Sequence, residues 1–112
     1  MEFKINNRTW KIVEMTQEEI KAEMKKHYDR PDELGKYFGL TYSDIQTIFL
    51  DKDLCQEQKR TTLIHELTHC YIESFITHMS NKEFSEEDVC DIVSYSHYII
   101  KDVVDQYFKE VK

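Results

Sequence analysis

The chain has 112 residues, of which 40% are hydrophobic and 33% are charged, and two glycines and one proline leave no candidate linker, so we expect a single domain over 1–112. The net charge is −7 and basic residues are interleaved with acidic ones, which excludes the basic stripe of a nucleic-acid-binding protein. No segment reaches the ~18 apolar residues of a membrane-spanning helix, and three cysteines without a C-x-x-C pair suit a reducing compartment, so a cytoplasmic protein is expected.

The first part of the chain predicts a β-hairpin followed by a helix. Hydrophobic and charged residues alternate over 3–5 and again over 10–12, and the asparagine pair at 6–7 favours a tight turn between the two strands. A capping-box sequence at 16–19 then opens a helix that we expect to reach about Tyr28.

Two more short strands and two long helices are expected in the rest of the chain. The strands lie near 37–40 and 46–51, and they are followed by a helix from about 56 to 79. A second capping pattern at 85–88 opens a last helix that reaches about Phe108. This order predicts an α+β fold: a small antiparallel sheet packed with an N-terminal helix and two long C-terminal helices.

The helix expected over 56–79 carries an H-E-x-x-H motif. His65 and His69 are four residues apart, so they share one face of the helix about one turn, or ~6 Å, from each other and can bind one zinc ion. Glu66 is rotated by roughly 100° around the helix axis, which places it beside the metal. It can therefore take a proton from a metal-activated water, which is the catalytic role of this residue in the motif.

A catalytic zinc site usually has three protein ligands and one water. The last helix can fold back antiparallel onto the motif helix, which makes Glu87 the candidate third ligand and Asp91 a second-shell partner for a ligand histidine. Glu86, on the neighbouring stripe, is the alternative ligand, whereas Glu73 lies too far along the helix axis to share the ion. Since the apolar band of the last helix lies opposite Glu87, a solvated acidic helix start is the competing interpretation.

These motifs resemble a known arrangement over about half of the chain. The H-E-x-x-H motif followed by Glu87-x-x-x-Asp91 is similar to the gluzincins of the thermolysin type and, more closely, to the compact ImmA/IrrE-type metallopeptidases. The resemblance implies a zincin-like minimal metallopeptidase with Glu87 as the third zinc ligand. Cys90 and Asp91 stand where that family usually has Ala and then Asn or Asp. The family typically cleaves a repressor, which implies a protein or peptide substrate, with a regulator or repressor among the candidates.

The expected function is therefore that of a zinc-dependent metallopeptidase. His65, His69 and Glu87 would hold the metal, while Glu66 would pass the proton of the attacking water to the leaving amine. Two alternatives stay open: a non-enzymatic interaction module that zinc stabilises, and another metal-dependent amide hydrolase. Imidazole and carboxylate ligands also accept Mn²⁺, Fe²⁺ and Ni²⁺.

Two further expectations concern the surroundings of the motif. The β-branched and aromatic run at 47–51 directly precedes the motif helix, so we expect an edge strand beside the zinc cleft that binds substrate as an added strand. A central strand is the alternative. Cys70 and Cys90 are expected to be small buried hydrophobic residues, and Cys55 is not expected to be a ligand.

Overall fold

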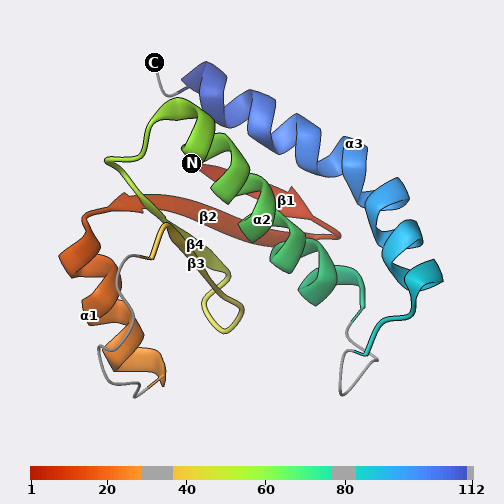
Figure 1. Cartoon of the computed structure of the whole chain (residues 1–112), viewed down its shortest axis with the longest axis horizontal. Helices are drawn as coiled ribbons and strands as arrows, with labels where there is room; N and C mark the ends of the chain where they lie inside the picture. Colours follow the sequence, from red (N-terminus) through yellow and green to blue (C-terminus); the bar gives the residue numbers. More distant parts are fainter. Residues whose placement is uncertain (29–36, 77–82, 111–112) are drawn as a thin grey trace.

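The computed structural model describes residues 1–28, 37–76 and 83–110. In these ranges the chain forms β1 (Glu2–Ile5), β2 (Arg8–Met15), α1 (Gln17–Tyr28), β3 (Gly39–Tyr42), β4 (Thr47–Asp51), α2 (Gln56–Phe75) and α3 (Glu86–Glu110) (Figure 1). The expected α+β class and order of elements are confirmed. The motif helix α2 ends at Phe75 instead of about 79, and positions 77–79 lie outside the described residues.

The sheet is mixed, so the expectation of a purely antiparallel sheet is wrong. Its strand order is β1-β2-β4-β3, with antiparallel pairing of β1 with β2 and of β3 with β4. The central pair is parallel and runs from Lys11 opposite Thr47 to Met15 opposite Asp51. A parallel pair needs a long crossover connection. Here the connection between β2 and β4 includes α1 and β3. The residue pattern of a single strand does not indicate whether its neighbour in the sheet runs parallel or antiparallel to it.

β4 is a central strand, which corrects the expectation that 47–51 forms the edge. It pairs with β2 on one side and with β3 on the other, and all five of its residues are buried. A strand covered on both faces is uniformly hydrophobic instead of alternating. The run Thr47-Ile48-Phe49-Leu50 has that character. The outer strand beside β4 is β3, which pairs on one side only among the described strands.

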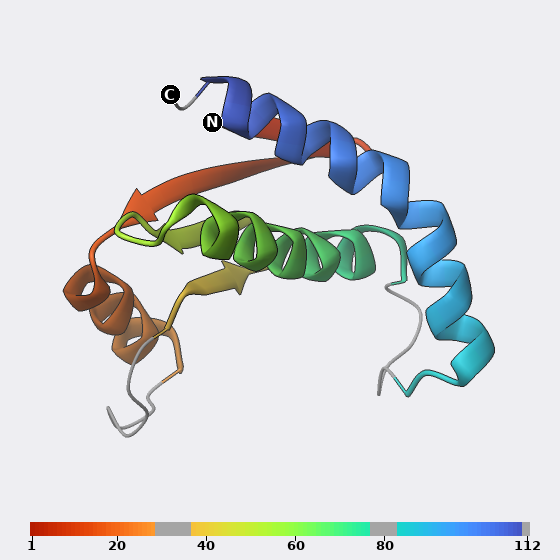
Figure 2. The same ribbon diagram turned by 45° about the horizontal axis from the view of Figure 1, so that its top comes forward.

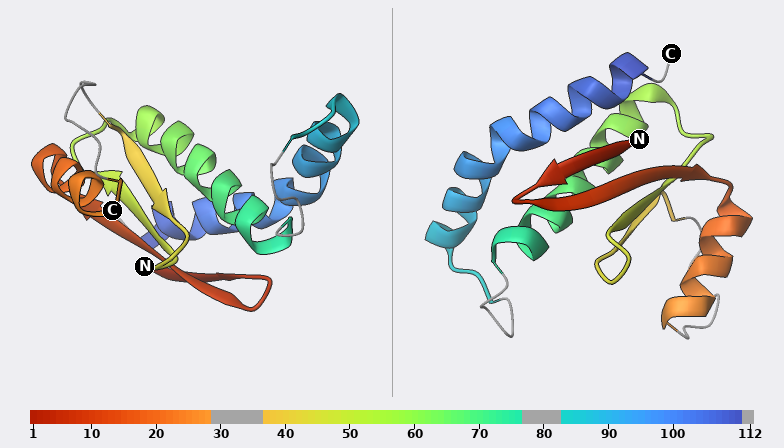
Figure 3. Two further views of the ribbon diagram at one scale, coloured as in Figure 1. Left: turned by 90° about the horizontal axis from the view of Figure 1, so that it is seen from below. Right: turned by 180° about the vertical axis from the view of Figure 1, so that it is seen from behind.

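Helices cover both faces of the sheet (Figure 3). On one face, α2 and the C-terminal half of α3 enclose the main core with Trp10, Ile48 and Leu67 among its members. On the other face, Ile20 of α1 packs into a smaller cluster with Tyr42 and Phe49. Burial of these side chains is the main favourable contribution to folding.

α3 runs antiparallel to α2, as expected (Figure 2). The guanidinium carbon of Arg60, near the start of α2, lies 4.3 Å from the ring centroid of Phe108 near the end of α3. The buried residues of α3 begin at Ser96, so the part of its N-terminal half that precedes Ser96 contributes no buried residue to the core. In Figure 2 this half extends past the end of α2 and away from the sheet.

The β1–β2 hairpin forms hydrogen bonds with the C-terminal end of α2. Its turn residues Asn6 and Asn7 have φ values of 49° and 66°, the left-handed conformation that tight hairpins favour. The Asn6 side-chain amide donates to the Ser74 carbonyl at 2.8 Å, and Arg8 donates to the Glu73 carbonyl at 3.1 Å. Trp10 Nε1 also donates to Ser74 Oγ at 3.2 Å. The hairpin thus satisfies carbonyls that a helix end leaves without partners.

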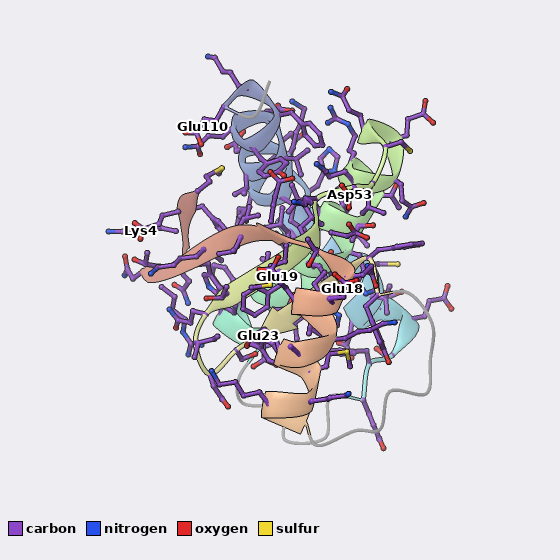
Figure 4. The ribbon with its side chains drawn as sticks, turned by 90° about the vertical axis from the view of Figure 1, so that its left-hand side faces the viewer. Lys4, Glu18, Glu19, Glu23, Asp53 and Glu110 are labelled. Atoms are coloured by element: carbon purple, nitrogen blue, oxygen red, sulfur yellow. The ribbon has the colours of Figure 1, made fainter. Side chains whose placement is uncertain are left out.

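Both predicted capping patterns form. Thr16 and Glu19 exchange hydrogen bonds at the start of α1, and Ser85 and Asp88 do so at the start of α3. Figure 4 shows the glutamates Glu18 and Glu19 in the first turn of α1, where the helix dipole favours negative charge. Among the helices of the described ranges, none has the length and apolar character needed to cross a membrane.

Candidate metal and catalytic site

A pocket of about 500 Å³ lies between α2 and the edge strand β3, with one side chain of α1 at its border. α2 supplies the two motif histidines and Glu66, while β3 supplies the opposite wall. The complete lining consists of Met24, Gly39, Leu40, Thr41, Ser43, His65, Glu66, His69 and Glu73. The two histidines and Glu66 of the H-E-x-x-H motif therefore line a pocket, while Leu67 of the same motif is buried in the main core.

The two histidines of the motif present their rings side by side in this pocket. Their ring centroids are 5.0 Å apart with an interplanar angle of 73°, as expected for positions i and i+4 of a helix. Both residues are exposed, and the side chain of His65 keeps 69% of its surface accessible. The imidazole nitrogens can therefore reach an ion in the pocket without any loss of core packing.

Glu66 lies between the histidines in sequence but is buried, with 6% of its surface exposed. Thr41 of β3 donates a hydrogen bond of 2.7 Å to Oε1 of this carboxylate. The second oxygen, Oε2, lies 3.9 Å from His65 Nε2. One carboxylate oxygen is thus held by the edge strand, and the other faces the histidine side of the pocket.

Gly39 allows β3 to approach α2 this closely. A Cβ atom at position 39 would lie 2.8 Å from Thr62 Cγ2 and 3.1 Å from Glu66 Cγ. Glycine inside a strand often marks such a close approach of another element. A larger residue at this position would push the strand and its Thr41 hydroxyl away from Glu66.

Cys70 is a residue of the motif helix α2 that points into the main core. It is fully buried in the main core, as expected, and burial raises the pKa of its thiol, with a further rise from the negative charge of Glu66. It therefore stays protonated and unreactive.

The expectation for Cys90 is wrong: this residue is exposed, because it lies in the part of α3 before Ser96, which is outside the core. Cys55 is also exposed and does not line the pocket.

The structure does not bring Glu87 and Asp91 to the histidine pair. α3 meets the side of α2 that carries Ile64 and Thr68, whereas the histidines face β3. Glu87 is exposed, and Asp91 lines a separate small depression. Within the ranges that the structure describes, no three His, Cys, Asp or Glu side chains are grouped so as to hold a metal ion. The assignment of Glu87 as ligand and Asp91 as its second-shell partner thus stays a prediction, as does the alternative Glu86.

Gly39 and Thr41 were not predicted from the sequence as site residues. A glycine in a strand followed by a threonine two positions later places both residues on the same face, which is a weak local signal. Their partner is Glu66, which lies 25 residues after Thr41, and only the tertiary structure makes this pairing visible.

The donors in the pocket suit a divalent ion of the zinc class. Two accessible imidazoles on one helix face can act as neutral nitrogen ligands, and a carboxylate lies next to them. Comparison of the chain with protein families, with curated proteins and with solved structures gave no match.

Proposed function

We propose that this chain is a zinc-dependent metallopeptidase of the minimal zincin-like kind, related in its site to the ImmA/IrrE type. The observation that supports the proposal is the juxtaposition of two accessible histidines with a buried Glu66 whose orientation is set by Thr41. When bound, zinc supplies Lewis-acid activation of water and of the scissile carbonyl. His65 and His69 would hold it.

Glu66 is the residue that moves protons in this proposal. Its Oε1 is occupied by the Thr41 hydroxyl, so Oε2 is the oxygen that takes a proton from water and delivers it to the leaving nitrogen. Burial of the carboxylate limits competing solvent contacts, and the hydrogen bond keeps the side chain from rotating.

The third ligand is proposed to be Glu87, with Asp91 supporting a ligand histidine. This assignment requires the N-terminal half of α3 to approach the histidine pair. No residue of α3 before Ser96 is buried, so such a movement would break little core packing.

The edge strand β3 offers a way to hold an extended peptide. The amide of Asp51 donates to the Phe38 carbonyl at 2.9 Å, which sets the phase of the antiparallel ladder with β4. Hydrogen-bonded pairs alternate along such a ladder, so the backbone groups of Gly39 and Thr41 point away from β4. A peptide that adds to this edge would run along the pocket past Glu66.

The proposed substrate is a protein or peptide, with a regulator or repressor among the candidates. We place the activity in the cytoplasm, because Cys55, Cys70 and Cys90 are all free and suit a reducing compartment.

Metal analysis combined with peptide hydrolysis tests the proposal. Purified protein should contain about one zinc per chain and should cleave members of an unbiased peptide library. The double variant His65→Ala/His69→Ala should lose both properties, while Glu66→Gln should keep the metal and lose hydrolysis by roughly 100-fold or more. His97→Ala, which removes an exposed histidine of α3 that does not line this pocket, is the matched control and should change neither.

Three results would contradict the proposal. Full zinc occupancy in the double histidine variant would show that the metal binds elsewhere. Zinc that binds to His65 and His69 and raises the melting temperature, without hydrolysis of any peptide, would favour the zinc-stabilised interaction module. Cleavage of non-peptide amides alone would favour another metal-dependent amide hydrolase.

A further inference from the structure

The pocket beside the histidine pair is acidic along its described lining. Its two charged side chains apart from the histidines are Glu66 and Glu73, and no lysine or arginine lines it within the described ranges. Glu66 is buried and bonded to Thr41, which suits the proton-transfer role of the proposed function. Glu73 is half-buried and contributes to the pocket wall one turn beyond His69.

The position of Glu73 along α2 relates it to a particular part of a bound peptide. From the midpoint between His65 and His69, Glu73 is ~9 Å further along the helix axis, at 1.5 Å per residue. An extended peptide rises ~3.3 Å per residue, so this distance corresponds to two or three substrate residues. A substrate side chain two or three positions from the scissile bond therefore comes opposite Glu73.

The other end of the cleft has a different character. Beyond Glu66 it continues as a second pocket of about 250 Å³, which Phe38, Gln58 and Thr61 help to line. Phe38 is 39% exposed, and apart from His65 and Glu66 the described lining of this pocket has no titratable side chain. Apart from Glu66, which lines both pockets, the described negative charge of the cleft thus lies only at the Glu73 end.

Arg8 lies near Glu73 but on its backbone side. Its guanidinium donates to the Glu73 carbonyl at 3.1 Å, and Arg8 does not line the pocket. The excess of acidic residues over the whole chain, a net charge of −7, adds a long-range attraction for cationic peptides.

We infer that the peptidase selects substrates with a lysine or arginine two or three residues from the scissile bond, on the side that faces Glu73. The inference rests on the proposed function, because it assumes that a peptide lies along β3 with its scissile bond at the histidine pair. A neutral, apolar residue is favoured on the opposite side, where Phe38 lines the cleft.

Paired peptide pools test this selectivity on the full-length zinc-loaded protein. Each pool carries Lys, Gln or Glu at the second and third positions on one side of the scissile bond and is otherwise degenerate. We expect kcat/KM to be at least about fivefold higher for Lys than for Gln on one side, and lower still for Glu. Glu73→Gln should abolish the preference for Lys, and Glu73→Lys should invert it in favour of Glu.

The matched control is Glu110→Lys, which makes the same change of charge at the end of α3, far from α1 and the pocket that α1 borders (Figure 4). This variant should keep the preference for Lys. Hydrolysis with the same ranking of the three pools in Glu73→Lys as in the unmodified protein would overturn the inference and leave the proposed function standing.

Binding gives a second readout that needs no turnover. Fluorescence anisotropy of the same labelled pools on Glu66→Gln should show tighter binding of the Lys pool, and adding Glu73→Lys should remove this difference. If no peptide is cleaved but this Glu73-dependent binding is observed, the proposed peptidase function fails and the charge selectivity of the pocket holds. Equal binding of all pools to both variants would overturn the inference.

Discussion

Thr41 and Glu66 join the edge strand to the motif helix through a hydrogen bond of 2.7 Å from the Thr41 hydroxyl to Oε1 of the carboxylate. The same hydroxyl lies 3.4 Å from the Glu66 backbone carbonyl. The strand that would present the substrate therefore also orients the residue that would transfer the proton. This contact makes the position of β3 part of the proposed catalytic arrangement.

Removing the Thr41 hydroxyl should reduce turnover without loss of the metal. A hydrogen bond to a charged group contributes about 1.5–3 kcal/mol, so Thr41→Val is expected to lower kcat roughly tenfold or more. Zinc content should stay unchanged, because the hydrogen bonds of the Thr41 hydroxyl in the described structure go to Glu66 and not to the histidines. Thr41→Ser keeps the hydroxyl and should restore most of the activity. Equal kcat in the Val and Ser variants would show that the contact has no positioning role.

Gly39 should tolerate no side chain. In Gly39→Ala the added Cβ would lie 2.8 Å from Thr62 Cγ2, and overpacking of this kind typically costs about 1–3 kcal/mol in unfolding free energy. Urea denaturation measures this loss. Thr62→Ser removes the Cγ2 atom, so the double variant Gly39→Ala/Thr62→Ser should recover part of it. A double variant that is less stable than the sum of the two single changes would contradict the close-approach explanation.

Metal titration tests the assignment of the third ligand on α3. Glu87→Ala should weaken zinc binding strongly, whereas Asp91→Ala should weaken it by roughly 10–100-fold as a change in the second shell. Glu86→Ala alters the neighbouring exposed carboxylate and is the matched control. If Glu86→Ala abolishes binding while Glu87→Ala has no effect, the alternative ligand is the correct one. Unchanged affinity in all three variants would exclude α3 from the metal site.

The cap of α1 predicts a pH dependence of stability. Hydrogen bonds from the backbone amide and hydroxyl of Thr16 lower the pKa of Glu19 in the folded protein. Since the folded value is below the unfolded one, the ionised carboxylate stabilises the fold above the unfolded pKa. This contribution is lost as the pH falls through the folded pKa. The unfolding free energies of wild type and Glu19→Gln should therefore differ at pH 7 and converge in acid.

Glu18→Gln provides the control for this measurement. It removes a carboxylate from the same first turn of α1 without removing the contact between Thr16 and Glu19. Equal losses of stability at pH 7 in Glu18→Gln and Glu19→Gln would mean that the helix dipole, and not the capping box, accounts for the effect.

The local features of this protein follow from its sequence alone. The spacing of His65 and His69 determines that both imidazoles share one face of a helix, because the α-helix repeats every 3.6 residues. The capping pair Thr16 and Glu19 and the turn at Asn6 likewise depend on backbone geometry within a few residues. These elements were predictable because the interactions that form them are close in sequence.

The tertiary structure alone decided which segments surround the motif. The sequence suggested that 47–51 forms the edge of the sheet, but β4 is central because β2 returns beside it in parallel and β3 covers its other side. The neighbour of Glu66 is therefore Thr41, and α3 packs on the side of α2 away from the histidines. Strand order and helix docking depend on which distant apolar surfaces are buried together, and residue periodicity within one element carries no information about that choice.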